Sequence, residues 1–174
     1  MNAKDPINIF VVDDNKVFAL ALKAEIETTF AEMPVTVHVF VTGETCMMQF
    51  NEVKPQVVIL DYHLNSRYFD AENGIKVLEW IKKDDKETQV IMLSNEEHID
   101  VAIQSFNNGA FDYVIKTETK FKRINNSLSN LFKMMKAKSE AKKYKYLVAG
   151  LLVCIAFLFG IVLVAKICSP SIAE

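Results

Sequence analysis

The chain has 174 residues, 51% of them hydrophobic, and a formal net charge of −2. This length excludes several large domains and leaves room for one compact domain of about 100 to 150 residues with a smaller appendage. The charge is unevenly distributed. Residues 1–115 carry 9 basic and 19 acidic side chains, whereas residues 116–146 carry 10 basic and 2 acidic ones. We therefore expect an acidic domain followed by a basic neck.

The cysteines and the N-terminus indicate the compartment. Cys46, Cys154 and Cys168 lie far apart and form no CxxC pair, which argues against a zinc site or a disulfide framework and favours a reducing compartment. The N-terminal sequence MNAKDPINIFVVDD contains only a short apolar run that ends in two aspartates. Because a signal peptide needs a longer apolar region, we expect the first domain to stay in the cytoplasm.

Apolar runs and helical patterns alternate along the first 135 residues. Four runs have the continuous Val/Ile/Leu character of strands buried on both faces: 9–12, 57–60, 90–93 and 113–115. A fifth run, 35–41, alternates with polar residues and is expected at a sheet edge. The helical patterns cover 17–30, 44–50, 75–81, 99–106 and a long segment from about Phe121. Five βα units in sequence predict a parallel sheet with helices on both sides.

Four of the predicted strands are followed directly by polar side chains. The first strand ends in Asp13 and Asp14, and the third ends in Asp61. The fourth ends in Ser94, and Lys116 follows the fifth. Ligands of open α/β sheets bind beyond the carboxyl ends of the strands. With strand order 2-1-3-4-5, these side chains are predicted to converge in one shallow pocket.

The residue types in this pocket favour phosphoryl chemistry. Three carboxylates held together repel one another unless a cation joins them. Mg²⁺ fits that need, because it favours a few carboxylates together with water and phosphate oxygens. One carboxylate can then act as a nucleophile and form an aspartyl phosphate. The Ser94 hydroxyl and the Lys116 ammonium are predicted to bind two of the phosphoryl oxygens.

Four sequence motifs closely resemble the receiver domain of bacterial response regulators over roughly residues 5–135. They are VVDD at 11–14, VVILDYHL at 57–64, IMLSN at 91–95 and NNGAFDYVIK at 107–116. The resemblance implies a (βα)5 flavodoxin-like, doubly wound parallel sheet. It also implies that Asp61 is the phosphorylation site and that Asp13 and Asp14 bind Mg²⁺. The main-chain carbonyl of His63 falls where the family supplies another metal ligand.

The resemblance assigns further roles and has two departures. Ser94 matches the hydroxyl switch residue, Tyr113 the aromatic switch, and Lys116 the lysine of the family motif. The family usually follows this lysine with a proline in a cis peptide, whereas Thr117 stands here, so a trans bond is expected. The segment 62–73 is several residues longer than the family norm. Both departures border the site, but neither removes a catalytic group.

The segment 147–165 predicts a transmembrane helix. Its 19 residues contain no charge, amide or proline, and a helix of that length reaches roughly 28 Å, close to the hydrocarbon thickness of a bilayer. Thirteen of them are Leu, Ile, Val or Phe, which contribute roughly −4 to −8 kcal/mol to insertion. The lysines before the segment outnumber the single Lys166 behind it, which predicts a cytoplasmic N-terminal domain at the inner membrane.

These features predict four parts: a receiver domain at 1–135, a basic juxtamembrane neck at 136–146, the transmembrane helix at 147–165 and a short tail at 166–174. The lysines of the neck are better explained by anionic lipid headgroups than by nucleic acid, so we expect no nucleic-acid partner. With nine residues after the span and no helix-turn-helix pattern, we expect no effector domain in this chain.

The predicted function is a membrane-anchored phosphoacceptor of a two-component phosphorelay rather than an enzyme, with only Mg²⁺-dependent self-phosphorylation and slow autodephosphorylation. Its phosphate is expected from a histidine kinase or a phosphotransfer protein, and its output from partner binding, homodimer formation or withdrawal of phosphate from other receivers. Two alternatives stay open. One is an unphosphorylated membrane scaffold with a receiver fold. The other is a phosphatase of the haloacid dehalogenase type, although the DxD sequence of that family is absent after the first strand.

Overall fold

The computed structural model describes residues 6–64, 72–95 and 99–168, except for some side chains near the end of the last helix. Strands and helices alternate strictly through these residues. In chain order they are β1 (Ile7–Val12), α1 (Lys16–Thr29), β2 (Val35–Phe40), α2 (Gly43–Val53), β3 (Val57–Asp61), α3 (Gly74–Asp84), β4 (Gln89–Ser94), α4 (Ile99–Asn107), β5 (Asp112–Ile115) and α5 (Lys120–Cys168). The chain divides into two compact units, Met1–Ser129 and Asn130–Glu174.

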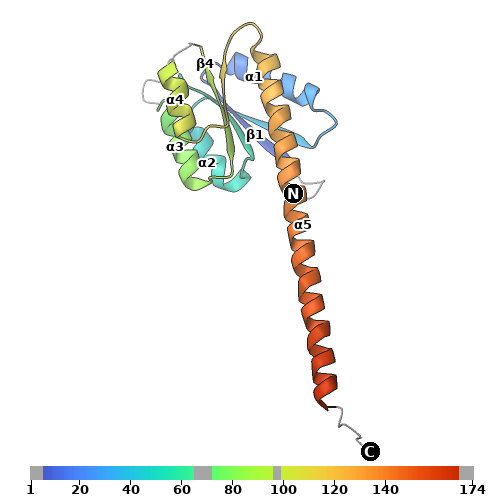
Figure 1. The fold of residues 1–174 in the computed structure, drawn as a ribbon. Helices are drawn as coiled ribbons and strands as arrows, with labels where there is room; N and C mark the ends of the chain where they lie inside the picture. Colours follow the sequence, from blue (N-terminus) through green and yellow to red (C-terminus); the bar gives the residue numbers. More distant parts are fainter. Residues whose placement is uncertain (1–5, 65–71, 96–98, 169–174) are drawn as a thin grey trace, which may run out of the picture. The chain divides into compact units, whose positions relative to one another are not determined.

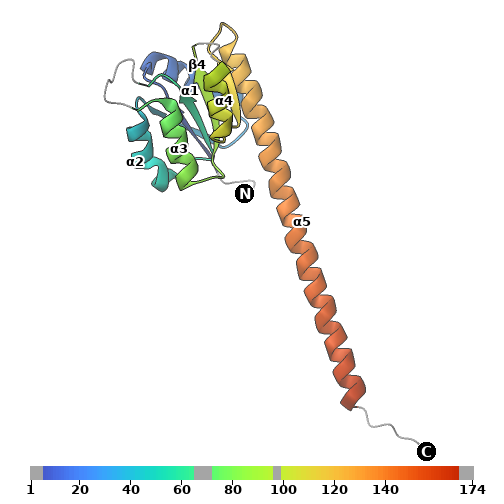
Figure 2. The ribbon, with the colours of Figure 1, turned by 60° about the vertical axis from the view of Figure 1, so that its left-hand side comes forward.

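The first unit is built on one parallel sheet of strand order β2-β1-β3-β4-β5. Helix α1 and the first turns of α5 cover one face of the sheet, and α2, α3 and α4 cover the other (Figures 1 and 2). The flavodoxin-like architecture and the strand order predicted from the sequence are confirmed. This order places β1, β3, β4 and β5 side by side, so their carboxyl ends share one edge.

The burial of each strand explains its sequence. All five residues of β3 are buried, as are the last four of β1 and the last five of β4, because helices cover both sides of these central strands. Strand β2 lies at the sheet edge, as its interleaved polar residues predicted, and only Val37 and Phe40 of its six residues are buried. Phe10, Leu60 and Met92 are fully buried in the cluster between the sheet and the helices α2 and α3. Each such side chain contributes roughly 1.5 to 3 kcal/mol to folding.

Polar caps set the first residues of three helices. The side chains of Asn15, Thr42 and Asn73 accept hydrogen bonds from backbone N–H groups three residues further on, which begins α1, α2 and α3. The ranges predicted from the apolar periodicity differ from these helices by one to three residues at their ends, because local hydrogen bonds, and not core contacts alone, set where a helix begins and ends. Helices α2 and α3 show the largest errors, since they extend to Val53 and Asp84 rather than to residues 50 and 81.

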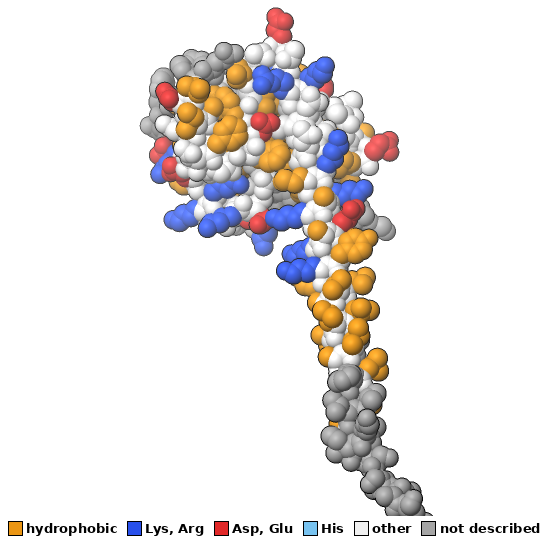
Figure 3. All heavy atoms as spheres, viewed as in Figure 1, with side chains coloured by type: hydrophobic (Ala, Val, Ile, Leu, Met, Phe, Trp, Pro, Cys, Tyr) orange, Lys and Arg blue, Asp and Glu red, His pale blue; other side chains and the backbone are white. Residues whose placement is uncertain are grey.

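Helix α5 begins in the first unit and continues into the second. In the first unit, Ile124 and Leu128 are fully buried. In the second unit, lysine side chains are followed by a stretch of exposed apolar side chains (Figure 3). No helix within the described part of the chain has the length and apolar character that a membrane span requires. The transmembrane helix predicted at 147–165 is therefore not supported. Six of its 19 side chains lie outside the described residues, so the apolar side chains that are described do not form an unbroken run.

Candidate functional site

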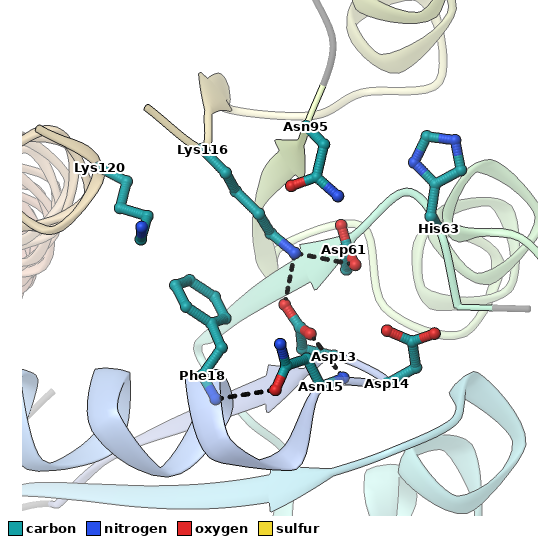
Figure 4. Close-up of a pocket in the computed structure, with 9 residues that line it drawn as sticks. All are labelled: Asp13, Asp14, Asn15, Phe18, Asp61, His63, Asn95, Lys116 and Lys120. Carbon is teal, nitrogen blue, oxygen red and sulfur yellow. Dashed lines mark hydrogen bonds and ion pairs between the residues drawn. The ribbon is translucent and has the colours of Figure 1, made fainter. Parts of the chain in front are cut away.

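The carboxyl ends of β1, β3 and β5 surround a pocket of about 260 Å³. Asp13 and Asp14 follow β1, Asp61 is the last residue of β3, and Lys116 follows β5 (Figure 4). The four side chains come from sequence positions as much as 103 residues apart. The sheet order alone brings them together, as predicted from the polar strand ends.

Lys116 bridges two of the three carboxylates. Its Nζ lies 2.6 Å from Oδ2 of Asp13 and 2.9 Å from Oδ2 of Asp61. The Lys116 side chain is 9% exposed, and those of Asp13 and Asp61 are 0% and 2% exposed. At these distances and this burial, water screens the attraction weakly, and the ammonium offsets part of the repulsion between the carboxylates.

The oxygens of the three aspartates differ in their availability to a cation. Asp13 uses both of its oxygens, since Oδ2 bonds to Lys116 and Oδ1 accepts the backbone N–H of Asn15 at 2.9 Å. By contrast, Oδ2 of Asp14 and Oδ1 of Asp61 are buried and have no hydrogen-bond partner among the described residues. Such orphaned buried oxygens are costly unless a ligand satisfies them.

The carboxylates fit a divalent cation. One oxygen from each of Asp13, Asp14 and Asp61 can be chosen so that all three lie within 4.8 Å of one another. Oxygen-only ligation with remaining positions for water and phosphate oxygens is the coordination that Mg²⁺ prefers. When bound there, Mg²⁺ would offset the negative charge of the carboxylates and stabilise the negative charge of a phosphoryl group.

Burial dominates the titration of Asp61. Desolvation raises the pKa of Asp61 to about 6, with the Asp13 and Asp14 carboxylates adding to the rise, while the nearby Lys116 ammonium opposes it. Desolvation also raises the pKa of Asp13, again against the attraction of Lys116. The pocket therefore holds its ionised carboxylates at a cost to stability, and a metal ion or a phosphoryl group can relieve that cost.

Three other predicted site residues lie around this centre. The His63 side chain lines the pocket, and the role of its main-chain carbonyl as a metal ligand stays a prediction. Ser94 is fully buried at the end of β4, and its carbonyl accepts the backbone N–H of Lys116 at 2.7 Å. Tyr113 on β5 packs partly buried against the hydrophobic cluster between the sheet and α2 and α3, rather than lining the pocket. The switch roles of Ser94 and Tyr113 stay predictions.

Four further residues line the pocket that the sequence had not singled out: Asn15, Phe18, Asn95 and Lys120. Asn15 carried a usable signal, because an asparagine directly before a helical pattern is a common N-cap. Asn95 follows Ser94 directly, so a search for polar residues at the strand ends could have included it. No sequence rule places Phe18 or Lys120 at the pocket, since that depends on how α1 and α5 begin.

The two departures from the receiver pattern lie beside this pocket. The described residues contain no cis peptide bond, so the trans bond expected before Thr117 is confirmed. The turn into α5 is held by two backbone hydrogen bonds, from Thr117 N–H to the Ile115 carbonyl at 2.9 Å and from Lys120 N–H to the Thr117 carbonyl at 3.1 Å. Most of the long segment 62–73 lies outside the described residues.

The fold and the site together define a class of protein. A five-stranded parallel sheet of order 2-1-3-4-5, three carboxylates at the ends of β1 and β3 and a lysine after β5 describe a phosphoacceptor signalling domain. The model of the response regulator receiver domain family matches residues 9–128, which is more than half of the chain. The chain belongs to this family.

Individual relatives agree with the family. The regulatory protein AtoC of Escherichia coli is 29% identical over 108 residues, which cover 62% of this chain and 22% of AtoC. The protein named "Probable C4-dicarboxylate response regulator DctR" of Bacillus subtilis is 34% identical over 99 residues, which cover 57% of this chain and 41% of DctR. The chain thus spans less than half the length of these two relatives.

Solved structures share the fold. The receiver domain of NtrX from Brucella abortus has a TM-score of 0.61 at 24% identity, with 70% of this chain and 95% of that chain covered. The BeF3-activated receiver domain of DrrB, a Thermotoga maritima protein, has a TM-score of 0.57 at 27% identity, with 72% and 99% covered.

Receiver domains are signalling phosphoacceptors that bind Mg²⁺ through an aspartate cluster and interact with histidine kinases or phosphotransfer proteins. They are not enzymes of the ordinary kind. The phosphatase alternative finds no support in these comparisons.

Proposed function

We propose that this protein accepts a phosphoryl group on Asp61 from a histidine kinase or a phosphotransfer protein. The observation that carries the proposal is the pairing of Asp61 with Lys116 at 2.9 Å in a pocket that also holds Asp13 and Asp14. In the transfer, an Asp61 oxygen forms a bond to phosphorus while the bond from phosphorus to the donor's imidazole nitrogen breaks. The nitrogen leaves with the electron pair, and with a proton on the other ring nitrogen the donor imidazole is then neutral.

The residues around Asp61 suit the charge that this step develops. Lys116 already touches the acceptor carboxylate, and its ammonium can move to a phosphoryl oxygen once the carboxylate has become an acyl phosphate. Asp14, Asp61 and the carbonyl of His63 would hold Mg²⁺, and Asp13 would join them as Lys116 changes partner. The hydroxyl of Ser94 would bind a second phosphoryl oxygen, since it lies at the neighbouring strand end. The only further self-catalysed reaction that we propose is slow loss of this phosphate.

The output is proposed to come from a change on the face formed by β5 and the adjacent helices. Ser94 and Ile115 are paired neighbours on β4 and β5, and Tyr113 lies two residues before Ile115. A shift of Ser94 towards the phosphate could therefore change the position of Tyr113 through the pairing of β4 with β5. We propose that a binding partner or a second copy of the chain recognises this change.

We also propose that the second unit attaches the protein to the inner membrane, with the receiver domain on the cytoplasmic side. Support comes from the 19 uncharged residues at 147–165 and from the exposure of the described apolar side chains among them, such as Leu151 at 57% and Leu158 at 62%. Tyr144 and Tyr146 are also exposed and lie next to Lys142, Lys143 and Lys145. Aromatic and basic residues at one end of an apolar helix are typical of a membrane interface.

Phosphorylation is tested by incubating the full chain with radiolabelled phosphodonor kinases in the presence of Mg²⁺ or a chelator. We expect a label that is labile at extremes of pH, depends on Mg²⁺ and is absent from Asp61→Asn. Retention of the label by that variant would assign the acceptor to another residue. Attachment is tested by fractionating cells: full-length protein in the soluble fraction would contradict the proposed anchor.

A further inference from the structure

A second lysine lies at the phosphoacceptor pocket. Lys120 is the first residue of α5 and lines the pocket with Lys116, on the far side of Phe18 (Figure 4). Its backbone N–H donates to the Thr117 carbonyl at 3.1 Å, so the turn after β5 fixes where the side chain starts. Among the described residues, no carboxylate forms a salt bridge with Lys120.

Aromatic rings form the support for this lysine. Phe18 on α1 and Phe121 on α5 stack with ring centroids 5.7 Å apart and an interplanar angle of 12°. The Nζ of Lys120 lies 5.8 Å from each centroid, and the Nζ of Lys116 lies 4.8 Å from that of Phe18. Ring faces attract ammonium groups at these distances. The Phe18 ring therefore holds two ammonium groups at one side of the pocket, although the two repel each other.

The charge of the site explains why a second ammonium is useful. A phosphoryl group on Asp61 adds a charge of about −2 and removes the charge of the carboxylate. With Asp13 and Asp14 ionised, the negative charge of the loaded site is about −4. One divalent cation and Lys116 supply only +3. A single further ammonium brings the site to neutrality, and Lys120 is the described lysine besides Lys116 that lines the pocket.

We propose that Lys120 is a second phosphoryl-binding residue, which leaves the Phe18 and Phe121 rings and binds an outer oxygen of the phosphoryl group on Asp61. This inference rests on the proposed function of Asp61. Lysine has a flexible four-carbon stem and three donor positions, so the ammonium can move between the rings and an anion while its backbone stays fixed. The contact stabilises the bound donor and the acyl phosphate through charge, and it makes no bond to the reacting carboxylate.

The test uses acetyl phosphate as the donor and the full chain in a mild detergent. An Asp61 oxygen bonds to phosphorus, and acetate leaves with the electrons of its phosphorus–oxygen bond. Lys120→Met keeps the length of the side chain but removes its charge. We expect the acetyl phosphate concentration for half-maximal labelling rate to rise roughly three- to tenfold, the size of one partly exposed charge contact. Lys120→Arg should restore the value to within about twofold, and the effect should shrink in 1 M salt because screening weakens the contact.

A matched control separates charge at the pocket from charge on the helix. Lys122 is on the same turn of α5 but is exposed and does not line the pocket, so Lys122→Met should leave the half-maximal concentration unchanged. Equal values for Lys120→Met, Lys122→Met and wild type would overturn the inference, as would a defect in Lys120→Met that Lys120→Arg fails to restore.

A second readout keeps the two proposals distinguishable. Binding of beryllofluoride with Mg²⁺, followed by fluorine NMR, requires no phosphoryl transfer. We expect Lys120→Met to weaken this binding by a similar factor. Failure of wild-type protein to label would contradict the proposed function, and the beryllofluoride titration would then decide the role of Lys120: weaker binding by the variant supports it, and equal binding overturns it.

Discussion

Replacing Asp61 with asparagine should stabilise the receiver domain at neutral pH. Asp61 is 2% exposed, and burial raises its pKa from 3.8 to about 6. The folded state therefore retains a proton between these two values that the unfolded state has lost. The contribution of the protonated Asp61 to the unfolding free energy is therefore present below about pH 4 and is lost as the pH rises through about 6. The difference of about 2 pH units corresponds to about 3 kcal/mol.

Asp61→Asn removes the free-energy cost of ionising this buried carboxyl. It also weakens the contact with Lys116, which then has only Asp13 as a charged partner among the described residues. We therefore expect the free energy of unfolding of Asp61→Asn to exceed that of wild type by about 2 kcal/mol at pH 7.5 in a chelator. The gain should be small near pH 4 and should disappear about one pH unit lower, where the wild-type carboxyl is protonated in both the folded and the unfolded state. Mg²⁺ should narrow the difference, because it favours the ionised wild-type site.

Denaturant titration followed by fluorescence measures this effect. Trp80 is the one tryptophan in the sequence, and it packs partly buried against the hydrophobic cluster on the α2 and α3 side of the sheet, so its signal reports on the receiver domain. Asp84→Asn, which changes an exposed carboxylate, is the control and should change the unfolding free energy by less than about 0.5 kcal/mol. A destabilised Asp61→Asn at pH 7.5, or a gain of equal size at pH 4, would refute the reasoning.

Four other variants test the site and the second unit. Lys116→Met leaves the buried Asp13 and Asp61 carboxylates uncompensated, so it should lower the unfolding free energy by about 2 to 4 kcal/mol at pH 7.5, with recovery towards pH 5; equal losses at both pH values would contradict this. Gly74→Ala should destabilise the domain and impair labelling, because a Cβ there would collide with the backbone carbonyl of Asp61; a wild-type melting temperature would argue against it. Asp14→Asn should weaken Mg²⁺ binding at least about tenfold in a calorimetric titration, since an orphaned carboxylate oxygen is lost, and an unchanged affinity would count against the metal site. Leu158→Arg should reduce membrane insertion, because a central arginine costs about 2.5 to 3.5 kcal/mol, and unaltered membrane recovery would speak against a span there.

The fold could be predicted from the sequence because its central strands have no ambiguity. The continuous apolar runs in β1, β3 and β4 leave no polar face, which is typical of parallel strands covered on both sides. The alternation of apolar and polar residues at 35–41 predicted an edge strand, because such a strand is covered less completely than a central one. Helix ends were less predictable, since caps such as Thr42 obey local hydrogen bonding rather than core packing.

The centre of the site was predictable, but its rim was not. Asp13, Asp61 and Lys116 lie at the carboxyl ends of β1, β3 and β5, which share one edge of the sheet, so the strand order places them together once it is known. Phe18 and Lys120 reach the pocket through the first turns of α1 and α5, whose directions depend on the packing of whole helices. The sequence also could not reveal that Lys116 already donates a hydrogen bond to Asp13. As a result, Asp14 and Asp61 are the carboxylates that each have a buried oxygen without a hydrogen-bond partner among the described residues.

Identification of the phosphorylated residue tests the central claim most directly. The full chain is incubated with a phosphodonor and Mg²⁺, the acyl phosphate is trapped by reduction, and the modified residue is located by mass spectrometry. The account predicts a single modification at Asp61, lost in Asp61→Asn and in the presence of a chelator. A modification on any other residue, or label that survives the chelator unchanged, would contradict it.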